Sequence, residues 1–379
     1  MDAAVLITIV VMTALAFDFT NGFHDTANAM ATSIATGALR PRAAVALSAV
    51  LNLLGAFLSV EVAKTISGGI VDESQISPAV IFGGLAGAIL WNLLTWYVGL
   101  PSSSSHALFG GLIGAAWISF GADSVHLTKI VEKILLPALA APLIAGLVGF
   151  IATWITYRIT RGVPDRLVTK GFRFGQIASA SLVSLAHGTN DAQKTMGVIT
   201  LTLISAGHLS PGSGPPVWVI VSAGTAIALG TYLGGWRITH TLGKGLTKLE
   251  APQGFAAQTS AATVILTSSH LGFALSTTHV CSGGIIGAGL GGRERDVRWS
   301  VARRMAVAWV LTVPAAAVVG AIAGKAASLG TGGVIGVAVV GIAVAVGIYL
   351  ASRRTPVGPA HVVDELYTPA EPTPARKVA

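Results

Sequence analysis

The most constraining feature of this sequence is a series of apolar stretches that are long enough to cross a lipid bilayer. A helix needs about 20 apolar residues to cross a hydrocarbon core about 30 Å thick. Such stretches occur near residues 43–60, 78–99, 134–157, 215–236, 255–275, 302–324 and 332–351. We therefore expect an all-α polytopic membrane protein, multi-pass in the cell inner (plasma) membrane.

The composition and the charge distribution agree with a membrane location. Of the 379 residues, 53% are hydrophobic and 11% are charged, whereas about a quarter of the residues in a soluble domain are charged. The net charge of +8 does not indicate a nucleic-acid partner, because the basic residues lie in short segments between apolar stretches, where they set orientation. The densest clusters, all expected in the cytoplasm, are residues 158–173, 293–304 and 353–354.

Two short motifs each occur twice in the chain. Residues 22–30, GFHDTANAM, precede residues 188–196, GTNDAQKTM, by 166 positions, and their glycine, aspartate and methionine coincide. Residues 103–115, SSSHALFGGLIGA, match residues 276–288, STTHVCSGGIIGA, at 7 of 13 positions. Internal duplication is the usual build of secondary transporters. We expect two repeats and, by analogy with transporter folds, an inverted topology.

Four further segments are apolar but irregular. Residues 4–39 and 175–207 are interrupted by polar side chains, whereas residues 101–120 and 276–291 are short or begin with polar residues. Non-helical backbone at membrane depth is tolerated only where protein or a water-filled cavity covers it. We therefore expect broken helices in such segments and two re-entrant hairpins, at 101–120 and 276–291.

The duplicated motifs also divide the chain. Each half contains an aspartate motif, two spans, a hairpin and further spans, and the joint falls in a basic segment. Prolines and mixed charges follow the last span, as in disordered tails. The expected divisions are a first transmembrane repeat at 1–160, a basic cytoplasmic loop at 161–174, a second transmembrane repeat at 175–354 and a disordered Pro-rich C-terminal tail at 355–379.

Asp25 and Asp191 occupy equivalent positions within otherwise apolar sequence. A carboxylate at membrane depth costs about 2.5–3.5 kcal/mol on insertion scales, so it needs a cation, a proton or several hydrogen-bond donors as a partner. With the amides of Asn28 and Asn190, the two aspartates form an oxygen-rich set suited to Na⁺ or to proton exchange. These four are the candidate coupling-ion residues. The alternative is that both aspartates lie near the interface and cap helix ends.

Lys194 distinguishes the second half from the first, because it occupies the position of Asn28. Its fixed positive charge could neutralise Asp191 or help to hold an anion, and the alternative is a structural Asp–Lys pair. Together with its neighbours Gln193 and Thr195, Lys194 is a candidate substrate-binding residue.

The two hairpin tips are rich in hydroxyl groups. Ser and Thr are preferred at helix N-caps, and the free N–H groups of a helix N-terminus attract anions. Six hydroxyl residues are therefore candidate substrate-binding residues: Ser103, Ser104, Ser105, Ser276, Thr277 and Thr278. As the alternative, these side chains only satisfy the backbone of a re-entrant segment. Four histidines, His106 and His279 in the hairpins and His24 and His187 beside the aspartate motifs, are proton carriers or neutral structural donors.

No pattern of a catalytic centre occurs in the sequence. It lacks an HExxH motif, a Gly-Lys-Ser loop that would cradle phosphates and a nucleophile-elbow glycine frame. The single cysteine, Cys281, excludes an internal disulfide framework and a multi-cysteine zinc site. We expect neither an enzyme nor an ATP-driven pump, and no cofactor or resident metal.

At these residues the chain resembles the inorganic phosphate transporter (PiT) family, bacterial low-affinity type. Residues 22–29 and 188–194 are similar to the duplicated signature of the family, and the hydroxyl-rich tips are similar to its re-entrant loops. The resemblance implies a low-affinity phosphate symporter that forms a homodimer. It also implies that the four coupling-ion residues line the ion and substrate centre and that the tips contact phosphate.

Two departures from the family pattern bear on the coupling ion. Many members have an asparagine before the aspartate and Ala-Asn after it in both halves, whereas this chain has His24 in the first half and Gln193-Lys194 in the second. Lys194 would replace one cation, so we expect proton coupling in preference to sodium. For bacterial members the resemblance also implies transport of a neutral metal–phosphate complex.

Alternative functions remain open. A sulfate or other oxyanion permease of the same fold would need a similar site, although only phosphate has a proton to donate near neutral pH. A non-transporting scaffold or channel would explain the apolar spans but not the duplicated aspartate motifs. The sequence therefore predicts import of inorganic phosphate by symport with a cation.

Overall fold

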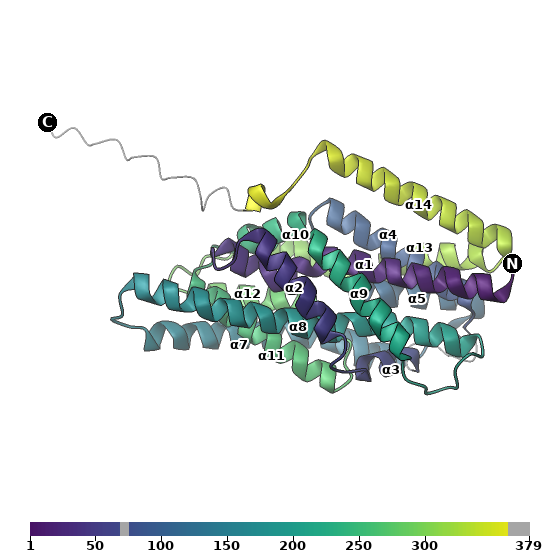
Figure 1. Ribbon diagram of the computed structural model, residues 1–379, viewed down its shortest axis with the longest axis horizontal. Helices are drawn as coiled ribbons and strands as arrows, with labels where there is room; N and C mark the ends of the chain where they lie inside the picture. The colour runs from purple at the N-terminus through teal and green to yellow at the C-terminus, as the bar shows by residue number, and fades with distance from the viewer. Residues whose placement is uncertain (69–75, 363–379) are drawn as a thin grey trace.

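The computed structural model describes residues 1–68 and 76–362, and within these ranges every extended element of regular structure is a helix (Figure 1). The α-helices are α1 (Ala3–Ala35), α2 (Pro41–Gly55), α3 (Glu61–Ser67), α4 (Pro78–Tyr97), α5 (Ser104–Phe120), α6 (Leu127–Ile130), α7 (Leu136–Ile159), α8 (Asp165–Ser205), α9 (Val217–Leu233), α10 (Trp236–His240), α11 (Ala251–His270), α12 (Thr277–Gly291), α13 (Trp299–Ala327) and α14 (Thr331–Arg354). Three short elements are η1 (Ala122–Ser124) and the π-helical η2 (Val131–Leu135) and η3 (Thr241–Gly245).

Several of these helices are long and apolar enough to cross a membrane. Five candidate spans lie in the described residues, and a sixth if the bent pair at Val217–Leu233 and Trp236–Gly245 counts as one. The five are α1, α4, Leu127–Ile159, α13 and α14. The expectation of an all-α, multi-pass membrane protein is confirmed.

The two long segments with polar interruptions are continuous helices, so the expectation of breaks there is wrong. α1 contains 33 residues and α8 contains 41. Neither helix contains proline, and their polar side chains find partners on neighbouring helices, so the backbone keeps its own hydrogen bonds. The sharp bend lies elsewhere, at 61° between α9 and α10, where Gly234 has φ +75°.

Two further expected segments differ in length from the structure. The expected span at 43–60 corresponds to α2, which has 15 residues and is shorter than the roughly 20 that a span needs. The expected basic loop at 161–174 is mostly helix, because α8 begins at Asp165 directly after Pro164. Pro164 is the N-cap residue of α8, and a proline there leaves no backbone N–H without an acceptor. The connection between α7 and α8 is therefore short.

The two halves of the chain pack on each other reciprocally. α1 packs closely on α9 and α8 on α2, while α5 packs on α13 and α12 on α7. Glycines allow the same close approach in both halves, since a Cβ on Gly22 would lie 2.3 Å from the Ile227 carbonyl oxygen and one on Gly188 would lie 2.2 Å from that of Asn52. The sequence duplication thus corresponds to duplicated helix packing.

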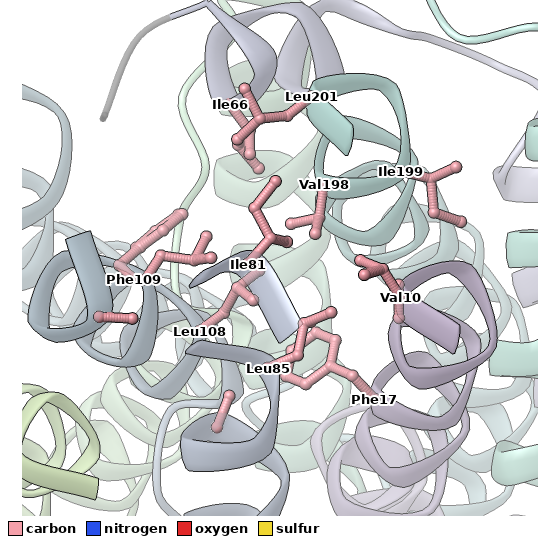
Figure 2. Packing of buried hydrophobic residues seen from close by; sticks show 14 of the residues in the cluster. Val10, Phe17, Ile66, Ile81, Leu85, Leu108, Phe109, Val198, Ile199 and Leu201 are labelled. Carbon is pink, nitrogen blue, oxygen red and sulfur yellow. The ribbon is translucent and has the colours of Figure 1, made fainter. Parts of the chain in front are cut away.

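α1 and α8 lie side by side and antiparallel. Thr36, just after α1, donates from Oγ1 to Gln176 Oε1 near the start of α8 (2.6 Å), and Asn21, earlier in α1, reaches Asp191, later in α8. Figure 2 shows part of the apolar cluster beside this pair, with labelled residues from α1, α3, α4, α5 and α8 such as Phe17 and Val198. The antiparallel arrangement brings the two aspartate motifs together.

The C-terminal part of the described chain lies against α10. Arg237 donates from Nη2 to the carbonyl oxygen of Ser352 (3.1 Å) and to Oγ1 of Thr355 (3.1 Å), and Val362 is buried. Of the expected disordered tail at 355–379, residues 363–379 lie outside the described residues.

Candidate functional site

Four helix segments meet at the candidate site. They are the middle parts of α1 and α8 and the N-terminal ends of α5 and α12. The tips of the two hairpins touch, because Ser105 Oγ donates to the Leu275 carbonyl oxygen (3.2 Å) and the rings of His106 and His279 lie 4.7 Å apart. Both aspartates are buried in this junction, so the site is closed in this structure.

Asp25 accepts hydrogen bonds from both hairpin tips. Ser104 Oγ lies 2.8 Å from its Oδ2, Thr278 Oγ1 lies 3.4 Å from its Oδ1 and Thr277 Oγ1 lies 3.5 Å from its Oδ2. The ring Nδ1 of His24 is 2.6 Å from Oδ1. These polar contacts around one carboxylate compensate part of its desolvation.

Asp191 is paired with a buried lysine. Lys194 Nζ donates to Asp191 Oδ1 (2.6 Å), and both side chains are fully buried. On Oδ2, Asn21 Nδ2 and Thr277 Oγ1 each donate over 3.3 Å, and His187 Nε2 also lies 3.3 Å away. The lysine therefore neutralises Asp191, one of the two roles considered for it from the sequence.

One hydroxyl group lies between the two carboxylates. Thr277 Oγ1 is within hydrogen-bond distance of Oδ2 of both Asp25 and Asp191, but a hydroxyl donates only one proton at a time. Ligand atoms of Asp25, His187 and Asp191 all lie within 4.8 Å of one another. Two carboxylates this close repel each other, and the Lys194 charge beside Asp191 offsets part of this repulsion.

The remaining hydroxyls of the tips serve the backbone. Ser103 Oγ accepts from the His106 backbone N–H and Ser276 Oγ accepts from that of His279, each over 3.2 Å. These are N-cap hydrogen bonds, and the two halves make them identically. Ser103, Ser105 and Ser276 thus hold the tips in place, while Ser104, Thr277 and Thr278 point at the carboxylates.

Of the other candidate residues, one lies in the site and two contact neighbouring helices instead. Asn28 joins the site, since its Nδ2 donates to Thr278 Oγ1 (3.0 Å). Asn190 donates instead to Ser269 Oγ (2.9 Å), and Gln193 Oε1 accepts from the Val62 backbone N–H at the start of α3 (2.8 Å). Asn190 and Gln193 therefore connect α8 to its neighbours and do not contact the carboxylates of the site.

Asn21 and Asp18 are polar residues near the site that the sequence motifs did not single out. Asn21 Oδ1 accepts from Ser104 Oγ (2.6 Å) while its Nδ2 reaches Asp191. The spacing of Asp18, Asn21, Asp25 and Asn28 follows one face of a helix. This periodicity was the available signal, and it is visible only if α1 is taken as unbroken.

The comparison with family models agrees with the geometry. A model described as "Phosphate transporter family" matches residues 21–169 and 160–320, which together contain both aspartate motifs and both hairpin tips. The chain belongs to the phosphate transporter family. The resemblance stated from the motifs is confirmed.

Relatives of the phosphate transporter family match most of the chain. A protein of Mycobacterium tuberculosis named "Probable low-affinity inorganic phosphate transporter" is 57% identical over 356 residues, which are 93% of this chain and 85% of that protein. A Bacillus subtilis protein of the same name is 44% identical over 329 residues, 85% and 98% of the two chains. These relatives are transporters, so the expectation that the chain is not an enzyme is confirmed.

A solved structure of the same fold is also similar. It is titled "The sodium-dependent phosphate transporter", superposes with a TM-score of 0.77, covers 86% of this chain and 99% of its own, and is 23% identical. At this low identity the similarity concerns the fold alone, which the two chains share.

Proposed function

We propose that this protein imports inorganic phosphate across the cell inner (plasma) membrane by symport with a cation, and that the cation is H⁺ in preference to Na⁺. The proposal is supported by membership of the phosphate transporter family and by the names of relatives such as the Mycobacterium tuberculosis protein. The observation that carries the mechanism is the sharing of hydroxyl donors around Asp25.

The shared donors provide a physical link between cation and anion binding. Ser104 and Thr278 each have one hydroxyl proton. Thr278 directs it at the Asp25 carboxylate, whereas Ser104 shares it between Asp25 Oδ2 (2.8 Å) and Asn21 Oδ1 (2.6 Å). A hydroxyl that donates to Asp25 cannot also donate to a phosphate oxygen. Protonation of Asp25, or a cation bound to it, releases these donors for phosphate. The cation therefore binds before the anion or together with it.

The residues around the two aspartates support protons as the coupling ion. Lys194 occupies the position equivalent to Asn28 and neutralises Asp191, which removes one negative charge that a sodium ion would need. His24 and His187 lie beside the two aspartates. The similar solved structure is named as sodium-dependent, so sodium is the direct competitor in the test below.

The topology follows from the same helix pair. α1 and α8 carry equivalent motifs and run antiparallel, so if they cross the membrane the two repeats have inverted orientations. We propose that the segments 101–120 and 276–291, whose helices are α5 and α12, are re-entrant and that the protein works as a homodimer. Crosslinking of purified protein in liposomes tests the dimer, and labelling of single cysteines at the two hairpin tips from each side tests the hairpins.

A second substrate form is a neutral metal–phosphate complex. It is favoured by the ligand atoms of Asp25, His187 and Asp191, which lie within 4.8 Å of one another. Carboxylate and imidazole groups bind divalent cations. Uptake that requires Mg²⁺ and stops with a chelator would support this form, whereas equal uptake with and without Mg²⁺ would exclude it.

Radiolabelled phosphate uptake into proteoliposomes tests the function. A pH gradient at constant sodium and a sodium gradient at constant pH are imposed in separate experiments, with excess sulfate as competitor. We expect accumulation with the pH gradient and no inhibition by sulfate. Uptake driven by sodium alone would overturn proton coupling, and competition by sulfate would favour the other oxyanion permease predicted as the alternative.

A further inference from the structure

Asp18 is a buried acid that the site described above does not use. Its side chain is fully buried, and within the described residues neither carboxylate oxygen has a hydrogen-bond partner. Asp25 and Asp191, by contrast, each accept from several donors. Asp18 lies inside α1, where the neighbouring backbone groups are bound within the helix, so the main chain offers it no compensation.

The surroundings of Asp18 contain few polar groups. Asn21 and Thr195 are the nearby polar side chains, and Asp191 and Lys194 of α8 are the charged groups that act on it. The Thr195 hydroxyl also lacks a partner among the described residues. The apolar cluster in Figure 2 includes Phe17, which precedes Asp18 in α1, and Val198, which lies three residues after Thr195 in α8.

The other helices packed on this part of α1 add no charge that could pair with Asp18. α4 and α9 pack on α1, and neither contains Asp, Glu, Lys, Arg or His. Within α1 the nearest ionisable groups are His24 and Asp25, about two helical turns away. Lys194 is already engaged by Asp191 at 2.6 Å. An ionised Asp18 would therefore be an uncompensated buried charge.

A proton satisfies this position better than a metal ion. A hard cation such as Na⁺ needs a shell of several oxygen ligands. The polar side chains that act on Asp18 are those of Asn21 and Thr195, and the Asp191 carboxylate is already engaged by Lys194. A proton requires only one carboxylate oxygen. It then turns the group into a neutral acid that can also donate to the unpartnered Thr195 hydroxyl.

We propose that Asp18 is a proton-binding site of the transport cycle, separate from Asp25 and Asp191. This inference rests on the proposed proton symport and assigns a binding residue for the transported proton. The step is the binding of H⁺ to the Asp18 carboxylate, with formation of one O–H bond, and its release to the other side of the membrane.

A side-chain connection links Asp18 to the substrate site. Asn21, one helical turn further along α1, donates to Asp191 (3.3 Å) and accepts from Ser104 (2.6 Å), which also donates to Asp25. Loss of the proton would place a negative charge beside the Asp191–Lys194 pair and attract Lys194 away from it. The closed arrangement therefore requires Asp18 to be protonated.

The pseudo-equivalent position offers a matched control. The offset of 166 residues that relates Asp25 to Asp191 relates Asp18 to Ser184. Ser184 is also fully buried, but its hydroxyl donates to the Ala180 carbonyl oxygen (2.9 Å) and it cannot carry a proton as an acid. Only one half of the protein has the acid.

The test compares Asp18→Asn, Asp18→Glu and Ser184→Ala with the wild type in proteoliposomes that contain a pH-sensitive dye. Phosphate exchange at equal pH and equal phosphate measures the movement of the carrier without net proton transport. We expect exchange by Asp18→Asn within about twofold of wild type, and a loss of at least about tenfold in pH-driven accumulation and in phosphate-linked acidification of the lumen. Asp18→Glu and Ser184→Ala should keep all three activities.

Three results would overturn the inference. In the first, Asp18→Asn accumulates phosphate with the pH gradient as the wild type does. In the second, folded Asp18→Asn loses exchange as strongly as driven uptake, and this loss would indicate a structural role for Asp18. In the third, the wild type transports phosphate only with a sodium gradient. This result would overturn the proton site at Asp18 but would agree with phosphate transport. A wild type that moves no phosphate under either gradient would contradict the proposed function itself.

Infrared difference spectroscopy keeps the inference testable if Asp18→Asn does not fold. Protein with ¹³C-labelled aspartate should show the carbonyl band of a protonated aspartic acid at neutral pH. In unlabelled Asp18→Glu this band should be replaced by that of a protonated glutamic acid. Absence of a protonated aspartate band in the wild type would overturn the inference.

Discussion

Lys194 Nζ lies 2.6 Å from Asp191 Oδ1, and neither side chain is exposed to solvent. The equivalent position in the first half is Asn28, which carries no charge and donates to Thr278. The two halves thus contribute equivalent helices to the site, but the second half carries one additional positive charge. This asymmetry, more than any other feature of the site, sets the expected coupling ion.

The first prediction concerns the variant Lys194→Asn, which restores the residue of the first half. Removal of one partner from a buried ion pair leaves an uncompensated charge and typically costs about 3–5 kcal/mol. We expect a lower melting temperature and transport that is lost or becomes sodium-dependent. Thermal unfolding in detergent and uptake under the two separate gradients measure these effects.

The exposed Lys64–Glu61 pair provides the control for this variant. Its N–O distance is 2.9 Å, and both side chains are about half exposed. Exposed pairs contribute roughly 0–1 kcal/mol, so Lys64→Asn should leave both measurements near wild type. Proton-driven uptake at the wild-type rate by Lys194→Asn would contradict the role of the lysine charge.

The second prediction concerns Asp25→Asn. The amide keeps the shape of the side chain but has no negative charge and cannot bind a proton as a carboxylate does, so the link between cation and hydroxyl donors is lost. We expect gradient-driven phosphate uptake to fall by about 100-fold or more. A change of this size corresponds to a free-energy difference of about 3 kcal/mol at 25 °C. The exposed Asp123→Asn is the control, and wild-type uptake by Asp25→Asn would remove Asp25 from the site.

The third prediction concerns the hydroxyl shared by the two carboxylates. Thr277→Val removes Oγ1 with little change in shape, which leaves Asp25 and Asp191 without their common donor. Loss of a hydrogen bond to a charged group costs about 1.5–3 kcal/mol, so we expect a rise in the phosphate KM of about 10-fold or more. Initial uptake rates over a range of phosphate concentrations measure it.

Thr263→Val is the matched control for the shared hydroxyl. Thr263 is exposed on α11, and its Oγ1 donates only to the Thr259 carbonyl oxygen of its own helix (2.9 Å). An equal KM change in both variants would show that the effect comes from helix stability and not from the site.

The fourth prediction concerns the close contact between α1 and α9. A Cβ on Gly22 would lie 2.3 Å from the Ile227 carbonyl oxygen, and a backbone atom in a packed helix cannot move aside alone. Gly22→Ala should therefore separate the helices and destabilise the protein by about 1–3 kcal/mol. Thermal unfolding measures the loss.

Gly336→Ala is the control for this contact, because a Cβ there would meet no atom within 4 Å. Its melting temperature should equal or exceed that of the wild type, since alanine favours a helix over glycine. A stable Gly22→Ala with a normal melting temperature would show that the α1–α9 approach is looser than the structure indicates.

The sequence by itself determined the membrane location, the duplication and most residues of the site. Apolar length is a local property that needs no tertiary partner, and Asp25, Asp191 and Ser104 stand out because each belongs to a motif that occurs in both halves. The family resemblance followed from the same residues and was confirmed.

Only the tertiary structure decided which polar residues face one another. The backbone of α1 stays helical through its polar segment because partners for the side chains come from α5, α8 and α12, far away in sequence. For the same reason Asn21 lies in the site whereas Asn190 and Gln193 bind neighbouring helices. The helical period of the polar residues in α1 places them on one face, but their hydrogen-bond partners are set by the packing of distant segments.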